Sequence, residues 1–261
     1  EACHLDDAWL DLITGRHEKV LGTKGWHDAG DYNKYVVNAG VTVGCMFRAW
    51  EDFHDVLKDF RLDIPESGGK IPDFLAEIKW EMDWLLTMQA PDGSAYYKLS
   101  TKDFGGFILP EKEIAPRYFT PTGSAATADF VAMTAAAARY YRPYDETYAD
   151  TCLAAAKKSY AYLVAHPQDQ RPDPAGVTTG GYGTSDPDDR LWAAAELWET
   201  TGDPEVLKDL ETRLRNTRTG IQANWDWGSV SNLGAFTYVL SKRPGRDATL
   251  VTQVKNSTLS V

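Results

Sequence analysis

Apolar residues recur along most of the chain at the three- and four-residue spacing that places side chains on one face of a helix. Within residues 73–89, Ile78, Met82 and Leu85 keep this spacing, so the segment is predicted to be a helix with one buried face. The same pattern predicts helices over residues 125–141, 145–166, 186–201 and 203–214, with weaker signals over residues 34–53, 229–241 and 247–259.

Several helix ends are marked by residues that suit them. Asp145 can cap the helix that follows it, because its carboxylate can accept a hydrogen bond from a free backbone N–H group. In Asp186-Pro187-Asp188-Asp189 the proline suits the first helical position, and the carboxylates suit the positive end of the helix dipole. Gly202 is expected to end that helix.

The segments between the helices point to an all-α fold with long loops. No stretch alternates apolar and polar residues for more than about four residues, which argues against an extensive sheet. Residues 62–71, 94–122 and 168–185 are rich in Gly, Pro, Asp and aromatic residues, and long ordered loops of this kind are usually functional. We expect helical hairpins arranged around an axis, with the long loops on one face.

Composition and charge exclude two classes of protein. Acidic residues outnumber basic ones by 38 to 27, and a net charge of −11 without a Lys/Arg-rich run argues against nucleic acid as a partner. No apolar stretch approaches the ~20 residues that span a bilayer, so a membrane protein is not expected. The chain opens at Glu1 without a signal peptide pattern, and its 3 cysteines do not form a disulfide framework. Trp80, Trp84, Trp192 and Trp198 stand at helical positions and are expected in the core.

The stretch of residues 25–35, Gly-Trp-His-Asp-Ala-Gly-Asp-Tyr-Asn-Lys-Tyr, carries the strongest chemical signal. Only Ala29 and Gly30 separate Asp28 from Asp31, and small residues permit a tight turn that directs both carboxylates to one point. Two close carboxylates can hold a water molecule and take its proton, and aromatic neighbours suit a sugar ring. Alternatively, Asp28 caps a turn and Asp31 caps the helix that starts near residue 34.

Residues 25–36 resemble the signature of glycoside hydrolase family 9, the inverting cellulases. The resemblance continues at residues 64–67, 71–73, 77–80, 88–93, 124–130 and 189–197, and covers most of the chain to about residue 235. It implies an (α/α)6 toroid of twelve helices, whose loops form an open cleft for β-1,4-glucan. The activity it implies is that of a secreted endo-β-1,4-glucanase, or cellulase.

The resemblance also implies roles for individual residues. Asp31 corresponds to the general base, and Asp28 to its partner in holding the nucleophilic water. An inverting glycosidase keeps base and acid ~6.5–9.5 Å apart to leave room for that water. The expected substrate-binding residues are Trp26, His27, Tyr182, Trp225 and Trp227, and the last two could form a platform on which a sugar stacks.

The chain departs from the family pattern in its last third. The family's acid is a Glu in a C-terminal Asn-Glu segment that follows a His-x-Arg segment, and neither occurs here, since the last Glu is Glu211. Residues 1–261 are therefore expected to form a single partial catalytic domain, with about eight of the twelve helices. Such an open ring would self-associate or bind a complementary fragment. The alternative function is a catalytically incomplete glucan-binding or structural fragment, and an acid from Glu111 or Glu113 lacks support.

Two metal sites follow from the resemblance. The first is a calcium loop before a helix, where oxygen-rich ligands suit this cation; its expected ligands are Thr184, Ser185, Asp188, Asp189 and a remote Asp226. The alternative is that Asp186 caps this helix. The second is a zinc site at Cys3, His4 and His17, with Arg16 in the place of a second cysteine. The alternative there is a half-buried cysteine with two surface histidines.

Overall fold

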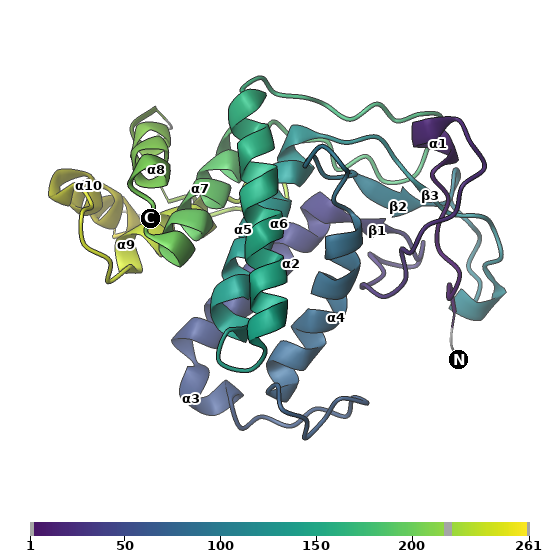
Figure 1. The fold of residues 1–261 in the computed structure, drawn as a ribbon, viewed down its shortest axis with the longest axis horizontal. Helices are drawn as coiled ribbons and strands as arrows, with labels where there is room; N and C mark the ends of the chain where they lie inside the picture. The colour runs from purple at the N-terminus through teal and green to yellow at the C-terminus, as the bar shows by residue number, and fades with distance from the viewer. Residues whose placement is uncertain (1–2, 217–220, 260–261) are drawn as a thin grey trace.

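The computed structural model describes residues 3–216 and 221–259 as a mainly helical molecule (Figure 1). The helices are α1 Asp11–Thr14, α2 Val36–Asp52, α3 His54–Leu57, α4 Asp73–Thr87, α5 Ser124–Tyr141, α6 Glu146–Ala165, α7 Pro187–Thr201, α8 Pro204–Asn216, α9 Ser231–Leu240 and α10 Ala248–Thr258. The strands are β1 Lys34–Tyr35, β2 Lys98–Ser100 and β3 Tyr118–Phe119, and Pro110–Lys112 form a turn of 3-10 helix, η1.

The eight helices predicted from periodicity are all present among the described residues, as α2 and α4 to α10. Asp145 caps α6 as expected, because its Oδ1 accepts a hydrogen bond from the backbone N–H of Tyr148 at 3.0 Å. Gly202 ends α7 in the left-handed conformation, at φ 70°. Helices α5 and α6 lie side by side in the middle of the molecule, with α8 to α10 on one side and the short strands on the other (Figure 1).

A small antiparallel sheet in the order β1-β2-β3 joins segments that were predicted to be loop or helix. Tyr35 pairs with Lys98, and Leu99 pairs with Phe119. Strands of two or three residues are too short to show alternation, so the sequence pattern could not reveal them. The sheet matters for the site because it places β1, at the end of the Asp28–Asp31 turn, against β2.

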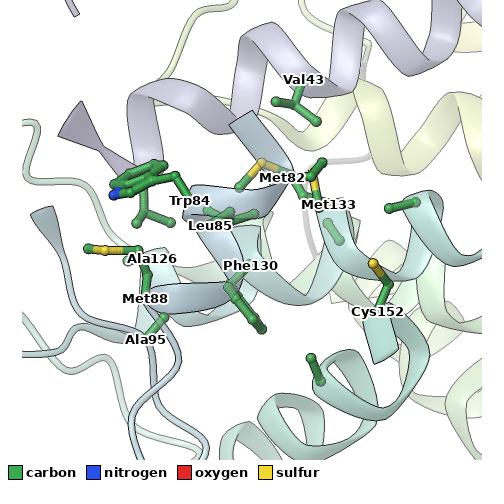
Figure 2. Close-up of a cluster of buried hydrophobic side chains, with 14 of the residues drawn as sticks. Val43, Met82, Trp84, Leu85, Met88, Ala95, Ala126, Phe130, Met133 and Cys152 are labelled. Carbon is green, nitrogen blue, oxygen red and sulfur yellow. The ribbon is translucent and has the colours of Figure 1, made fainter. Parts of the chain in front are cut away.

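The core is built where α2, α4, α5 and α6 meet. Figure 2 shows Val43 of α2, Met82 and Leu85 of α4, and Phe130 of α5 packed together, and all four are fully buried. A second apolar cluster joins α5 to α7, α8, α9 and α10. Burial of this apolar surface is the main stabilising contribution to such a fold.

The tryptophans divide between core and surface. Trp84, Trp192 and Trp198 are buried as expected. Trp80 is 42% exposed, so its assignment to the core was wrong. Its place on α4 lies on the side that faces the segment before the turn, and there its indole N–H donates a hydrogen bond to the carbonyl of Gly25 at 3.3 Å. None of the described helices is long and apolar enough to cross a membrane.

Candidate functional site

The turn that carries Asp28 and Asp31 is anchored to helix α4. Gly25, at φ 78°, adopts a conformation that favours glycine, and a Cβ added there would lie 2.8 Å from the side chain of Trp84. Its backbone N–H donates to the carbonyl of Trp80 at 3.2 Å. The positive φ and the close approach of Trp84 explain why glycine starts this segment, since any larger residue would push the turn away from the helix.

The next residue, Trp26, is held by two glutamates one helical turn apart. Its indole N–H donates to Glu77 Oε1 at 2.8 Å, and its backbone N–H donates to Glu81. Glu81 is fully buried, and burial raises the pKa of its carboxyl group to about 7. The half-buried indole of Trp26 is therefore fixed in direction.

Asp31 accepts hydrogen bonds on one oxygen and leaves the other without a partner. Its Oδ2 accepts from the hydroxyl of Tyr35 at 2.6 Å and from the amide of Asn33 at 3.2 Å. Its Oδ1 is buried and accepts no hydrogen bond from residues 3–216 or 221–259. The alternative role as a helix cap is wrong, because α2 starts at Val36 with no capping side chain. Asp31 is thus oriented through Oδ2, and among the described residues nothing occupies Oδ1, which could accept a proton.

Asp28 is bound from two other elements. Tyr182, in the loop before α7, donates its hydroxyl to Asp28 Oδ2 at 2.5 Å, and Asn38 of α2 donates to Oδ1. Burial and the bond to Asp28 raise the pKa of Tyr182 to about 12, so its hydroxyl stays protonated at neutral pH. The Tyr182 ring meets the Tyr35 ring edge to face at 4.8 Å. A pair of touching tyrosines thus joins the two aspartates.

Aromatic residues and a cavity surround this pair. Trp227 packs edge-on against Tyr182 at 5.0 Å between ring centroids, and Trp225 is half-buried against the core. A cavity of about 270 Å³ is lined by Trp26, His27, Asp28, Tyr35, Asn38, Ala39, Thr42 and Glu81. The structure therefore links Trp227 to the Asp28 side of the site through Tyr182, while Trp26, His27 and Asp28 share one cavity.

The N-terminal metal candidates form a different group from the expected one. Cys3, His4 and His27 offer ligand atoms within 4.8 Å of one another. His17 does not join them, and that assignment needs correction: its ring stacks on Trp9 at 3.8 Å and its Nδ1 pairs with Asp11 at 2.9 Å. His27 was expected to bind substrate, but its contact with the His4 ring, at 5.2 Å, also makes it a ligand candidate.

Glu113, one of the two glutamates considered as an acid, lies beside this N-terminal group. Its Oε2 lies 3.2 Å from His4 Nε2, and the residue is 8% exposed. Burial raises the pKa of its carboxyl group. The hydrogen-bond partner of Glu113 is thus His4 and not a residue of the Asp28–Asp31 turn.

A buried ion pair ties the turn to two distant segments. Arg117, just before β3, donates to both carboxylate oxygens of Asp7 and to the backbone carbonyl of Tyr32. Arg117 is 2% exposed and Asp7 7%. Lys34 Nζ lies 3.8 Å from the same Asp7 carboxylate. Tyr32, which follows Asp31, is therefore held through its carbonyl by an arginine that a buried ion pair fixes in place.

The expected calcium loop packs against the segment that contains Asp226. Thr184 donates its hydroxyl to the carbonyl of Gly228 at 3.2 Å, and Asp188 Oδ2 accepts from the backbone N–H of Val230 at 2.8 Å. These two hydrogen bonds join the segments, and Asp226 Oδ1 accepts from the backbone N–H of Gly228 at 2.9 Å within its own segment. Ser185 is exposed beside Thr184.

The first aspartate of this loop, Asp186, binds an arginine of α7. Asp186 does not cap α7 through its side chain, and that interpretation is wrong. Its Oδ2 instead accepts from Arg190 Nε at 2.6 Å. The remaining guanidinium nitrogens of Arg190 donate to backbone carbonyls at the end of α6, including Leu163 at 2.9 Å, so the pair fixes the start of α7 on α6.

Sequence reasoning missed Asp129, which lies opposite Asp189. Asp129 is fully buried on α5 and Asp189 is 1% exposed, and no carboxylate oxygen of either accepts a hydrogen bond from a donor in the described part of the chain. Burial, and then the charge of the neighbouring aspartates, raise the pKa of both carboxyl groups well above the usual range. An aspartate inside an alanine-rich apolar helix was the signal available. Such unsatisfied carboxylates need a proton or a cation.

One family matches the chain along nearly all its length. Glycosyl hydrolase family 9 matches residues 1–258. Endoglucanase D of Acetivibrio thermocellus is 58% identical over 261 residues, which are 99% of this chain and 42% of that protein. The chain thus spans less than half the length of that relative.

Solved structures of the same family are similar to the chain in fold. The chain is similar to the Bacteroides ovatus GH9 structure, with a TM-score of 0.90 and 32% identity, over 99% of this chain and 50% of that one. It is also similar to AaCel9A in complex with cellobiose-like isofagomine, with a TM-score of 0.87 and 34% identity, over 99% of this chain and 49% of that one.

Proposed function

This chain belongs to glycosyl hydrolase family 9, and on that premise we propose that the protein hydrolyses β-1,4-glucosidic bonds of cellulose or related β-glucans with inversion. The expected fold class is confirmed, since the matching family 9 endoglucanases are (α/α)6 barrels. The observation that carries the proposal is Asp31, whose Oδ2 is fixed by Tyr35 and Asn33 while Oδ1 has no partner among the described residues.

In this mechanism Asp31 acts as the general base. Its carboxylate takes a proton from a water molecule as the water oxygen forms a bond to the anomeric carbon, and the bond to the leaving oxygen breaks on the opposite face. Asp28, held by Tyr182 and Asn38, is proposed to accept the second hydrogen bond of that water. The leaving oxygen takes its proton from a general acid, for which the family uses a Glu that this chain does not contain.

Substrate is proposed to bind through the aromatic side chains around the turn. Trp26 and Trp227 present ring surfaces fixed by Glu77 and Tyr182, respectively, and such surfaces stack on the C–H faces of a sugar. His27, Tyr182 and Trp225 complete the proposed binding set. AaCel9A, which this chain resembles, binds a cellobiose-like isofagomine, which supports a β-1,4-glucan as the ligand.

Hydrolysis is tested with matched β- and α-linked polymers. The natural full-length polypeptide is incubated with carboxymethylcellulose and with amylose, and new reducing ends are measured. Release from the β-glucan alone supports the proposal, and equal release from both contradicts it. Binding of cellohexaose without any release would favour the alternative, a glucan-binding fragment without a complete acid–base pair.

We propose calcium binding where the loop before α7 meets the segment around Asp226. Thr184, Ser185, Asp188, Asp189 and Asp226 would hold the ion, and oxygen donors of this kind suit calcium. The fit rests on the unpartnered carboxylate of Asp189 and on the contact between the two segments. A bound cation would neutralise carboxylates that otherwise repel one another.

Chelation is expected to lower the melting temperature. A ligand present at about 100 times its Kd stabilises the native state by ~2.7 kcal/mol, which for this size corresponds to a fall of about 5–10 °C when it is removed. Melting is followed by circular dichroism in EGTA, then after addition of calcium or of magnesium. Recovery with calcium alone is expected, and an unmoved melting curve would refute the site.

Zinc is proposed at the N-terminal group. Cys3, His4 and His27 provide a thiolate and two imidazoles, which are ligands that zinc prefers, and their ligand atoms lie close enough to share one ion. When bound, zinc would fix the segment before Asp28 and supplies no catalytic step. We also propose that the protein acts outside the cell, since a polymeric glucan is its substrate.

Produced as these 261 residues alone, the protein is proposed to self-associate. Large apolar side chains are exposed at several helix ends, including Val164, Leu240 and Leu259. At ~25 cal/mol per Å², covering a few hundred Å² of apolar surface offers several kcal/mol for association. Light scattering is expected to give a mass above the 29.0 kDa of one chain. A monodisperse 29.0 kDa species at micromolar concentration would contradict this.

A further inference from the structure

Lys98 of strand β2 is a buried cation that the proposed chemistry does not use. It is 3% exposed, and no carboxylate of the described residues lies within salt-bridge distance of it, although the charge of Asp31 acts to raise its pKa. Its Nζ instead donates to the carbonyl and the hydroxyl of Thr179, both at 3.1 Å, and to the carbonyl of Gly180 at 2.9 Å. Burial lowers the pKa of its ammonium group to about 8, which reflects the cost of placing a charge there.

The neighbours of Lys98 bind the same loop. Tyr97 donates its hydroxyl to the carbonyl of Gly181, and the hydroxyls of Ser100 and Thr179 lie 2.5 Å apart. The side chains of Tyr97, Lys98 and Ser100 thus hold three consecutive residues, 179–181. We call residues 179–181 the strapped loop.

Tyr182 directly follows the strapped loop, and its hydroxyl donates to Asp28 Oδ2 at 2.5 Å. Tyr182 has a φ of 31°, which a non-glycine residue adopts only when its surroundings impose it. Gly180 is equally confined, since an added Cβ would lie 2.9 Å from the Tyr182 ring and 3.0 Å from the Tyr35 hydroxyl. A shift of the strapped loop must therefore move the Tyr182 hydroxyl relative to Asp28.

We propose that Lys98 is a positioning residue, whose three hydrogen bonds to the strapped loop hold Tyr182 on Asp28 and so align the carboxylate that orients the attacking water. The sheet supports this role, because Lys98 pairs with Tyr35 in the register of β1 and β2, and its Nζ lies 5.6 Å from the centre of the Tyr35 ring. Lys98 thus lies against Tyr35, which binds Asp31, and binds the strapped loop before Tyr182, which binds Asp28. The inference rests on the proposed function of the two aspartates.

The test compares Lys98→Met, Lys98→Gln, Tyr182→Phe and the double variant Lys98→Met/Tyr182→Phe in the natural full-length polypeptide. Gln keeps N–H donors without the charge, whereas Met keeps length without donors. Lys102→Met is the matched control, because Lys102 is an exposed lysine close in sequence. Two quantities are measured: hydrogen exchange of the peptide that covers residues 178–183, and kcat and KM on a soluble β-glucan.

Lys98→Met is expected to speed exchange in residues 178–183 about tenfold or more, because hydrogen bonds to a charged donor are individually strong. It should lower kcat about tenfold with little change in KM, and Lys98→Gln should recover most of both losses. In the Tyr182→Phe background the Lys98→Met change should have little further effect on kcat, because both act through one contact. Lys102→Met should behave as the unchanged protein.

Unchanged exchange in Lys98→Met would overturn the proposal, as would losses of kcat that multiply in the double variant. If Lys98→Met does not fold, Lys98→Gln is measured in its place. It is expected to lose part of the protection against hydrogen exchange in residues 178–183 and in no other peptide. Protection equal to that of the unchanged protein would overturn the proposal. The exchange measurement needs no turnover. If the protein hydrolyses no β-glucan but shows the expected exchange pattern, the proposed function is contradicted and the contact between Lys98 and the strapped loop is still established.

Discussion

Asp31→Ala is expected to lower kcat on a soluble β-1,4-glucan by about 10²–10⁴-fold or more in the natural full-length polypeptide, because it removes the group proposed to take the proton from water. KM should change little, since the aromatic rings that hold the sugar remain. The melting temperature should also stay close to its original value. Asp31 contributes hydrogen bonds to Tyr35 and Asn33 only, and its Oδ1 has no partner in the described part of the chain.

Two further variants separate base loss from general damage. Asp28→Asn should cost less than Asp31→Ala, because the amide oxygen can still accept the hydrogen bond from Tyr182, although the amide nitrogen then replaces the oxygen that accepts from Asn38. Asp55→Ala is the control, since Asp55 is an exposed aspartate of α3, outside the site. Turnover of a correctly folded Asp31→Ala variant within a few-fold of normal would remove Asp31 from the mechanism.

Arg117→Ala is expected to destabilise the protein by about 3–5 kcal/mol, the cost of leaving one member of a buried ion pair without its partner. The carboxylate of Asp7 would then face the interior with only Lys34 nearby, at 3.8 Å, and the carbonyl of Tyr32 would lose its donor. The free energy of unfolding is measured by denaturant titration.

Two controls show whether burial is the cause. Arg142→Ala breaks the 2.6 Å pair with Asp150, whose side chains are 39% and 65% exposed, and should cost less than about 1 kcal/mol. Asp7→Leu combined with Arg117→Met should recover part of the Arg117→Ala loss, because the Asp7 carboxylate is no longer left without Arg117, while Lys34 keeps its hydrogen bonds to the carbonyls of Gly22 and Lys24. A loss of under 1 kcal/mol for Arg117→Ala would show that the pair contributes no more than an exposed one.

The helices could be predicted because each carries its own periodicity over ten or more residues. Asp145 and Gly202 mark ends by local chemistry alone, and both behave as predicted. Trp80 was wrongly assigned to the core because periodicity gives the spacing of the buried face of a helix but not its width. A residue at the edge of the buried face of α4 therefore has the same spacing as one at its centre. The sheet was missed because its strands have only two or three residues.

The Asp28–Asp31 turn could be found because its two carboxylates and small spacers are neighbours in sequence. Its partners could not, because Tyr182 lies 154 positions from Asp28 and reaches it only through folding. The ligand candidate His27 was passed over for His17 because the nearer histidine in sequence is not the nearer one in space. Lys98 and Asp129 become meaningful only once burial is known.

The stereochemistry of the first product tests the central claim most directly. A cellooligosaccharide is hydrolysed inside an NMR tube by the natural full-length polypeptide, and the anomeric proton of the new reducing end is observed before mutarotation. If Asp31 activates a water for direct attack on the anomeric carbon, the product appears first as the α-anomer. First appearance of the β-anomer would mean a covalent intermediate, and would contradict the role assigned here to Asp31.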